Sequence, residues 1–252
     1  MVGRVGGDCA KADVPWARSR LAGALRELLL MDVLGPTMDL YTRRRVRGTE
    51  HLDRLEAPVV FVANHSSHMD TPTILRALPR RWRRRTAVAA ATDYFYRKRT
   101  TAQAVSLLFN TVPMQRSGGG LESESSSHLD GLIADRWNLL VFAEGTRSRD
   151  GSVGRLRSGA AVLAAAHGLD IVPIHVSGTH AVMPPGRRWM RRKRRRRGSR
   201  RHRIEIRFGP PISPRAGEHR TEVMERVRLF FAASGATTTP CEQPPSKRSV
   251  SA

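Results

Sequence analysis

The fold of this chain is decided by residues 58–72, Pro58-Val59-Val60-Phe61-Val62-Ala63-Asn64-His65-Ser66-Ser67-His68-Met69-Asp70-Thr71-Pro72. The run 59–63 is apolar throughout, which predicts a buried strand. Asp70-Thr71-Pro72 predicts the start of a helix, with Pro72 early in the first turn, where its missing N–H costs little. The polar residues between them then form a loop from a strand end to a helix start.

A histidine and an aspartate in this loop can act as a base and its orienting partner. Imidazole has the side-chain pKa nearest neutrality, so His65 can take a proton from an alcohol during a reaction. Asp70 can hold the ring, select its tautomer and stabilise the imidazolium. No obvious serine or cysteine nucleophile accompanies the pair, so we expect His65 to activate a hydroxyl of the substrate.

Two other interpretations of this loop stay open. Asp70 could serve as an N-cap that satisfies free amide donors at the helix start, a role that does not exclude orienting His65. His68 is a rival base, which we interpret instead as polar loop or helix-start structure.

Strands alternate with helices along the rest of the chain, which points to a single α/β domain. Its 252 residues are enough for one sizeable core. Further strands are predicted at residues 86–91, 112–114, 138–143, 170–176 and 204–208, helices at 128–137 and 159–167, and a Ser- and Gly-rich loop at 117–127.

The predicted organisation has a helical region before the main domain and a disordered segment at each end. Residues 1–20 and the Ser-, Thr- and Pro-rich residues 233–252 are expected to be disordered. The domain itself covers residues 47–232 and includes a basic insertion at 186–203.

Residues 21–46 are predicted to form the amphipathic N-terminal helical region, with leucines near one helical face. About 20 mainly apolar residues would be needed to cross a bilayer. Charged residues interrupt this segment, so it is expected to pack on the core or to lie on a membrane surface. The leucines are Leu21, Leu25, Leu28 and Leu29, and the interrupting residues are Arg26, Glu27 and Asp32.

The formal charge of +22 predicts anionic partners: nucleic acid, anionic lipid, phosphorylated substrates or an acidic protein. Basic residues gather around Trp82 and, more densely, between Arg187 and Arg203. The two cysteines, Cys9 and Cys241, lie near opposite ends of the chain and can build neither a disulfide framework nor a zinc site.

Four blocks of this sequence resemble, in order, the motifs of the glycerolipid acyltransferases, and most nearly those of the 1-acyl-sn-glycerol-3-phosphate acyltransferase branch. One block alone would be a weak signal, whereas four in order at plausible spacing are specific. The resemblance covers residues 47–211 and implies one domain with a central mixed sheet flanked by helices. The blocks are Asn64-His65-x-x-x-x-Asp70, Val112-Pro113-Met114-Gln115-Arg116, Phe142-Ala143-Glu144-Gly145-Thr146-Arg147-Ser148 and Ile171-Val172-Pro173-Ile174.

The resemblance also implies roles for these residues. His65 and Asp70 are the expected catalytic pair. The expected binding site for the acceptor phosphate comprises Arg116, Glu144, Gly145, Thr146 and Arg147. The guanidinium fork suits phosphate oxygens, Gly145 allows close backbone approach, and Glu144 is expected to orient a neighbouring arginine. Val172, Pro173 and Ile174 either shape an apolar wall for the acyl chain or support the site, with Pro173 at a strand edge or irregular point.

One position departs from the family pattern. Arg157 stands where many relatives have lysine, which keeps the charge and changes the donor geometry.

The implied activity is transfer of a fatty acyl group from acyl-CoA or acyl carrier protein to the free hydroxyl of 1-acyl-sn-glycerol 3-phosphate (lysophosphatidic acid). The product would be phosphatidic acid, and no metal or redox cofactor is implied. Alternatives are another acceptor (glycerol 3-phosphate, a lysophospholipid or a glycolipid) and, more remotely, a basic nucleic-acid-binding protein.

The arginine tract has several possible partners. It suits an anionic bilayer, to which each basic residue can contribute about 1 kcal/mol. It could also be solvated surface, or a docking site for acidic acyl carrier protein or nucleic acid. We expect a peripheral protein at the cytoplasmic face of the cell membrane, where acyl thioesters are available.

Overall fold

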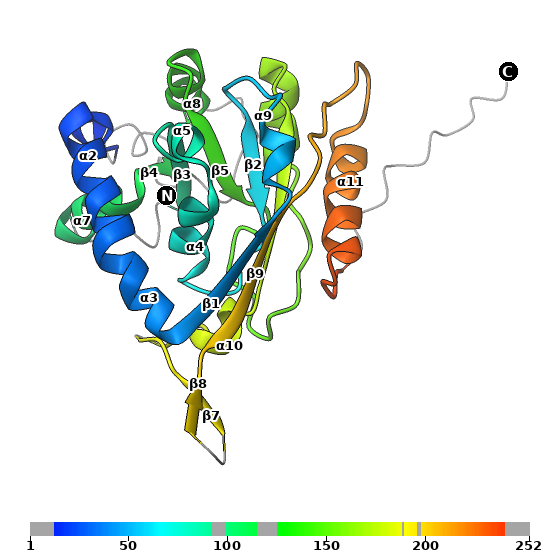
Figure 1. Cartoon of the computed structure of the whole chain (residues 1–252). Coiled ribbons are helices and arrows are strands. Elements are labelled where there is room, and N and C mark those ends of the chain that lie inside the picture. The colour runs from blue at the N-terminus through cyan, green and yellow to red at the C-terminus, as the bar shows by residue number, and fades with distance from the viewer. Residues whose placement is uncertain (1–12, 92–98, 115–124, 188, 196–197, 240–252) are drawn as a thin grey trace, which may run out of the picture.

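A seven-stranded mixed sheet forms the centre of the molecule in a computed structural model, and helices lie on both of its faces (Figure 1). The model describes residues 13–91, 99–114, 125–187, 189–195 and 198–239. The strand order is β1-β9-β6-β2-β5-β3-β4, and a separate hairpin pairs β7 with β8. The predicted α/β class and mixed sheet are confirmed.

The helices and strands of the described residues are, in chain order, η1 (Pro15–Arg18), α2 (Arg20–Leu28), η2 (Leu29–Leu34), α3 (Gly35–Tyr41), β1 (Thr42–Arg47), η3 (Thr49–Leu52), β2 (Val60–Ala63), α4 (Asp70–Ala77), α5 (Arg80–Arg83), β3 (Thr86–Ala91), α7 (Arg99–Phe109), β4 (Thr111–Met114), α8 (Ser125–Ala134), β5 (Asn138–Phe142), α9 (Gly159–His167), β6 (Ile171–Ser177), α10 (Thr179–Val182), β7 (Lys193–Arg195), β8 (Gly198–Arg200), β9 (His202–Phe208) and α11 (Arg220–Ala233).

The strands β6, β2, β5, β3 and β4 run parallel, so their carboxyl ends meet at one edge of the sheet. β9 runs antiparallel to β6, and β1 runs parallel to β9. The predicted loop follows β2 at this edge, beside the segments that leave β5 and β6. Residues 64–70, 143–148 and 178–179 are therefore brought together.

The strand β2 explains why its sequence is apolar throughout. Successive side chains of a strand point to opposite faces, and here both faces are covered. Val60 and Val62 belong to the core beneath α8, α9 and α11, whereas Phe61 and Ala63 belong to the core beneath α3, α4 and α5. All four residues are fully buried.

The N-terminal arm, which we define as α2, η2 and α3, packs on the sheet domain with one side only. Leu30 and Met38 are buried in the core beneath α4. The predicted apolar face points outward: Leu21 is 81%, Leu25 43% and Leu28 52% exposed. None of the helices in the described part of the chain is long and apolar enough to span a membrane.

Three charged residues of the arm, Arg26, Glu27 and Asp39, attach it to the domain. Arg26 is buried and donates to the carbonyl of Leu107 (2.8 Å), near the end of α7. The other inward contacts are ion pairs, Glu27 with Arg83 of α5 and Asp39 with Arg76 of α4 (2.9 Å).

Several predicted boundaries were wrong. The helical region does not extend to residue 46, because 42–47 form strand β1 beside β9. Residues 15–18 and 20–28 are helical, although residues 1–20 were expected to be disordered; residues 1–12 lie outside the described part. Residues 237–239 pair with Val153, so the tail is ordered at least that far, and residues 240–252 lie outside the description.

Two of the longer helices and a hairpin were not predicted. These helices are α7, which ends at Phe109 shortly before the predicted strand at 112–114, and α11, which covers one face of the sheet. α8 begins at residue 125, inside the expected loop, and ends at 134. The basic insertion contains the β7–β8 hairpin, which extends away from the sheet below α3 (Figure 1).

Candidate active site

The loop after β2 is fastened to both neighbouring strands. The Asn64 side chain donates to the Val176 carbonyl (2.9 Å) and accepts from the Val176 N–H (2.8 Å), which ties the loop to β6. On the other side, the Ser148 N–H donates to the His65 carbonyl (2.8 Å). His65 therefore has a fixed backbone position at the carboxyl edge of the sheet.

The structure brings His65 and Asp70 together as the sequence predicted. His65 Nδ1 lies 2.9 Å from Asp70 Oδ2, and the Asp70 side chain is fully buried. Because a carboxylate only accepts, Nδ1 carries the proton and Nε2 of the neutral ring is the acceptor. The imidazole stacks on Phe142, with 4.0 Å between ring centroids, and keeps 18% of its side-chain surface exposed. The pair has the geometry of a base and its orienting partner; its catalytic role stays a prediction.

Asp70 also accepts hydrogen bonds from three other groups. The N–H groups of Ser66 and Ser67 donate to Oδ2 (2.7 and 2.8 Å), and the Thr179 hydroxyl donates to Oδ1 (2.5 Å). Asp70 is the first residue of α4, and both N–H donors precede the helix. Its carboxylate thus organises the loop, and the N-cap interpretation was wrong.

Thr179 is a site residue that sequence reasoning missed. It follows Gly178, whose φ of +87° makes the turn after β6, and a Cβ on that glycine would lie 2.2 Å from the Arg203 carbonyl oxygen. Thr179 and Asp70 are 109 residues apart, so only the neighbouring positions of β2 and β6 bring them together.

Glu144 makes two backbone contacts that the sequence did not predict. Its carboxylate accepts from the N–H of His65 (2.8 Å) and from the N–H of Gly154 (2.8 Å). Burial raises the pKa of Glu144, and the two N–H donors oppose that rise. These contacts join the loop after β2 to the segment after β5, and the expected orientation of an arginine by Glu144 stays a prediction.

Two arginines lie around the turn after β5. Gly145 has φ of +70°, and a Cβ there would lie 2.8 Å from Arg157 Nε, so the guanidinium of Arg157 rests against the glycine backbone. Arg147 is half-buried and hydrogen-bonds with Nε2 of His68, while Thr146 is exposed. These residues can form part of an anion site; Arg116, the other expected phosphate ligand, lies outside the described residues.

The fourth block lies within the core. Val172 and Ile174 are fully buried among residues packed beneath α3 and α4, and Pro173 is in register with Val62 of β2. Pro173 immediately precedes the residues of β6 that are in register with β9, and the Gly209 N–H donates to its carbonyl (2.8 Å). Of the two expected roles, this position favours structural support.

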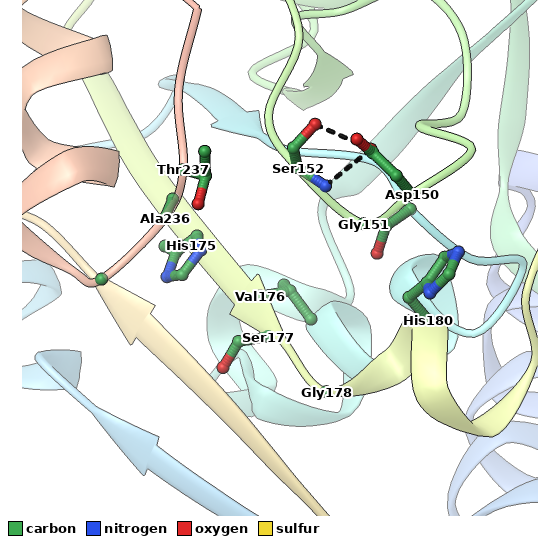
Figure 2. A pocket seen from close by; sticks show the side chains of 12 residues that line it. Asp150, Gly151, Ser152, His175, Val176, Ser177, Gly178, His180, Ala236 and Thr237 are labelled. Atoms are coloured by element: carbon green, nitrogen blue, oxygen red, sulfur yellow. Dashed lines mark hydrogen bonds between the residues drawn. The ribbon is translucent and has the colours of Figure 1, made fainter.

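A polar pocket of about 400 Å³ adjoins the loop after β2 (Figure 2). It is lined by residues 150–152, 175–178 and 235–237 together with Ser66 and His180. Ser66 Oγ lies 3.3 Å from Thr179 Oγ1, which connects the pocket wall to the groups around Asp70. His175 projects into the pocket, and burial and then Arg207 lower its pKa to about 4, so its ring is neutral at pH 7.

The described residues contain no cluster of histidine, cysteine and carboxylate side chains arranged to hold a metal ion.

Comparisons with known proteins agree with the blocks read from the sequence. The family model described as Acyltransferase matches residues 43–177, from β1 to the end of β6. The chain is 30% identical over 147 residues to the chloroplastic 1-acyl-sn-glycerol-3-phosphate acyltransferase BAT2 of Brassica napus, covering 56% of this chain and 39% of that protein. It is 30% identical over 141 residues to the chloroplastic 1-acyl-sn-glycerol-3-phosphate acyltransferase LPAT1 of Arabidopsis thaliana, covering 56% and 38%. The chain therefore spans less than half the length of these curated relatives.

A solved structure shares the fold. The crystal structure of the 1-acyl-sn-glycerophosphate (LPA) acyltransferase PlsC from Thermotoga maritima matches with a TM-score of 0.60 and 22% sequence identity. The match covers 85% of this chain and 84% of the other. The mixed sheet and its flanking helices are thus an arrangement already seen in a solved structure.

Proposed function

Because the chain belongs to the acyltransferase family, whose model covers more than half of it, we propose that it acylates the free hydroxyl of 1-acyl-sn-glycerol 3-phosphate and forms phosphatidic acid. The observation that carries this proposal is the hydrogen bond between His65 Nδ1 and the buried carboxylate of Asp70. It leaves Nε2 as the acceptor for a substrate proton. The reaction would belong to phospholipid biosynthesis.

The reaction needs no nucleophile from the protein. His65 Nε2 takes the proton of the acceptor hydroxyl while that oxygen bonds to the carbonyl carbon of the acyl thioester. Asp70 stabilises the imidazolium that forms. When the tetrahedral intermediate collapses, the carbon–sulfur bond breaks and His65 returns the proton to the sulfur, which releases an ester and a free thiol. The acceptor attacks directly, so no acyl-enzyme forms.

The turn after β5 supports a phosphorylated acceptor. Arg147 and Arg157 flank Gly145, and Thr146 adds an exposed hydroxyl. Guanidinium groups bind phosphate oxygens through paired N–H donors. Glu144 holds the His65 backbone through a hydrogen bond, so the phosphate end of the acceptor and its reacting hydroxyl are positioned by connected parts of the site. We propose Arg116 as a further phosphate ligand, and this assignment rests on the family pattern alone.

Arginines on one face of the neighbouring strands β1 and β9, which we call the basic sheet face, support a donor that carries negative charge, either CoA or an acidic acyl carrier protein. Residues paired in register on neighbouring strands point to the same face of a sheet. The face adjoins the carboxyl end of β6 through the register Ser177↔Glu205. Arg43, Arg45 and Arg203 on it are exposed. The pairs that define the basic sheet face are Arg43↔Arg203, Arg45↔Glu205 and Arg47↔Arg207.

The N-terminal arm supports peripheral binding to an anionic membrane at its cytoplasmic face. The exposed leucines of α2 form an apolar strip near the start of the arm. The start of the basic insertion contacts the other end of the arm, at Tyr41 of α3. Trp189 Nε1 donates to the Tyr41 hydroxyl (3.3 Å), and the Arg192 guanidinium lies 5.6 Å from the centroid of the Tyr41 ring. Exposed indole, leucine and arginine together suit the interface of an anionic bilayer.

The deciding experiment is acyl transfer by purified protein. Radiolabelled oleoyl-CoA is supplied with lysophosphatidic acid, glycerol 3-phosphate or a neutral lysolipid, beside the His65→Ala variant. We expect labelled phosphatidic acid from the wild type. The rate should fall by about 10²- to 10⁴-fold in the variant, the usual contribution of a general base.

Each other outcome revises a separate part of the proposal. Transfer only to glycerol 3-phosphate or to a neutral lysolipid would replace the acceptor. Transfer only from acyl carrier protein, in a parallel set of reactions, would fix the donor. Substantial transfer by a folded His65→Ala protein would remove His65 from the mechanism, and no transfer from either donor would overturn the function.

A further inference from the structure

His68 is a rigidly held histidine that the mechanism above does not use. Its neighbours in the loop are buried and bonded on both sides: the Ser67 hydroxyl donates to the Met183 carbonyl (2.7 Å) and accepts from the Met69 N–H (3.1 Å). The His68 ring is half-buried, and Arg147 Nη1 hydrogen-bonds to its Nε2. The two residues are 79 positions apart and come from the loops after β2 and β5.

The direction of this hydrogen bond follows from the groups involved. A guanidinium has donors only, so Nε2 of His68 must be the acceptor and the ring must be neutral. The surroundings favour that state: burial first, then the charges of Arg147 and His65, lower the pKa of His68 to about 4, and Asp70 opposes them. At neutral pH His68 therefore presents a lone pair to Arg147.

A neutral hydrogen-bond acceptor can orient an arginine that binds phosphate without reducing its positive charge. A carboxylate could also orient the guanidinium, but its charge would cancel the positive charge that attracts the substrate. An imidazole fixes one N–H and leaves the net charge of Arg147 intact. The guanidinium then keeps its full charge and a defined orientation for binding an anion.

We propose that His68 is a positioning residue, which orients the Arg147 guanidinium toward the phosphate of the acceptor and so sets the preference for phosphorylated acceptors. This inference rests on the proposed function, in which Arg147 binds that phosphate. It replaces our interpretation of His68 as polar loop structure and makes it neither a base nor a substrate ligand.

The test compares KM and kcat for two acceptors that differ only in the phosphate, lysophosphatidic acid and 1-acylglycerol. In His68→Ala we expect the KM for lysophosphatidic acid to rise about tenfold or more, since a hydrogen bond to a charged group is lost. The kcat and the KM for 1-acylglycerol should stay near wild-type values. His68→Gln, whose amide oxygen can accept from Arg147, should recover most of the lost affinity. His68→Glu should lower it further through charge cancellation.

His167→Ala is the matched control, because this half-buried histidine on α9 contacts Asp130, away from the site. Equal changes for both acceptors in His68→Ala, or a loss confined to kcat, would overturn the inference. Should His68→Ala not fold, His68→Gln and His68→Glu carry the same comparison, and equal KM values in these two would overturn it.

Failure of the inference is separable from failure of the function. If Arg147→Ala raises the KM for lysophosphatidic acid and for 1-acylglycerol equally, Arg147 does not bind the acceptor phosphate. If Arg147→Ala raises the KM only for lysophosphatidic acid while the His68 variants change both KM values equally, only the proposed role of His68 is wrong.

Discussion

The carboxylate of Asp70 is buried without exposed surface, a position that is costly for a charge unless its lone pairs are occupied. Here His65, two N–H groups and the Thr179 hydroxyl supply four hydrogen bonds. The donors come from the loop after β2 and from the turn after β6. Because both segments hold the carboxylate before substrate binds, the His65 ring needs little reorganisation during the reaction.

Removal of the Thr179 hydroxyl should therefore impair both folding and catalysis. In Thr179→Val the buried Oδ1 of Asp70 loses a donor, so we expect a loss of about 1–3 kcal/mol in the free energy of unfolding. We also expect a lower kcat with little change in KM. Urea denaturation and steady-state kinetics measure the two effects. Thr179→Ser, which keeps the hydroxyl, is the control, and an unchanged kcat in the valine variant would show that Thr179 does not act through Asp70.

At the level of single residues, the sequence could predict only contacts that are local. His65 and Asp70 are five positions apart in one loop, so their meeting follows from the loop itself. The contacts of His68 with Arg147 and of Thr179 with Asp70 depend on which strands are neighbours. The contacts of Glu144 with the N–H groups of His65 and Gly154 were not predictable for a related reason, because no side-chain pattern reveals a backbone partner.

Among the elements, α2 departs from the usual arrangement of a surface helix. Arg26 and Glu27 of α2 contact the domain, whereas Leu21, Leu25 and Leu28 face outward. Arg26 donates to the Leu107 carbonyl in the last turn of α7, where helix carbonyls lack intrahelical partners. This outward apolar strip is the part of the arm that we propose to contact the membrane.

Replacement of that strip should weaken membrane binding without weakening the fold. We expect the triple variant Leu21→Gln, Leu25→Gln, Leu28→Gln to bind vesicles of anionic phospholipid at least about 100-fold more weakly, because burial of each leucine contributes up to roughly 1.5–3 kcal/mol. Its free energy of unfolding should change little, since exposed positions seldom affect stability. Cosedimentation with vesicles measures the binding.

The control for this experiment is Leu229→Gln on α11, because Leu229 is 53% exposed but lies outside the arm. Equal binding by wild type and the triple variant would rule out the arm as the membrane contact. Equal losses in the triple variant and the Leu229 variant would indicate a nonspecific effect of surface polarity.

At the level of elements, β2, β5 and β6 were predictable because both faces of each strand are covered and their sequences are therefore apolar runs. β1 escaped prediction because it is an edge strand with the sequence Thr-Arg-Arg-Arg-Val-Arg. Charged side chains on edge strands discourage pairing with other chains, and they also remove the apolar signal. Residues 21–46 were consequently predicted to be helical throughout.

At the scale of the whole molecule, the class of fold was predictable and the order of strands was not. Alternating strands and helices pointed to an α/β domain, and the family resemblance added the mixed sheet. The return of β9 antiparallel to β6, which brings β1 into the sheet, follows from contacts between distant segments. That return also creates the basic sheet face, which a reading of charge along the chain could not locate.

The stability of the molecule should decrease as the pH falls from about 6.5 to about 4. The pKa values of His68 and His175 are lowered to about 4 in the folded protein, so the unfolded chain binds more protons over this range. Above pH 6.5 the two histidines make their full contribution to the free energy of unfolding. This contribution is lost as the pH falls toward their pKa values in the folded protein. One such group changes the free energy of unfolding by up to about 1.4 kcal/mol per pH unit. The raised pKa of Glu144 acts in the opposite direction.

The contribution of His175 can be isolated by urea denaturation at pH 7 and pH 4.5 with the non-titrating variant His175→Asn. The wild type should lose more stability between these two pH values than the variant does, and all other groups cancel in the comparison. Identical losses would show that His175 is not held neutral by the fold.

The hydrogen bonds between Val153 and the residues beyond α11 set a practical limit on shortening this chain. The Val153 N–H donates to the Thr237 carbonyl (2.8 Å), and the Thr239 N–H donates to the Val153 carbonyl (3.0 Å). The next N–H, that of Gly154, holds Glu144, which in turn holds the His65 backbone. A truncation at the end of α11 would leave the helices of the core in place but remove both hydrogen bonds to Val153, which adjoins the Gly154–Glu144–His65 contacts. The smallest unit suitable for enzymology, or for fusion to a reporter, therefore extends through Thr239.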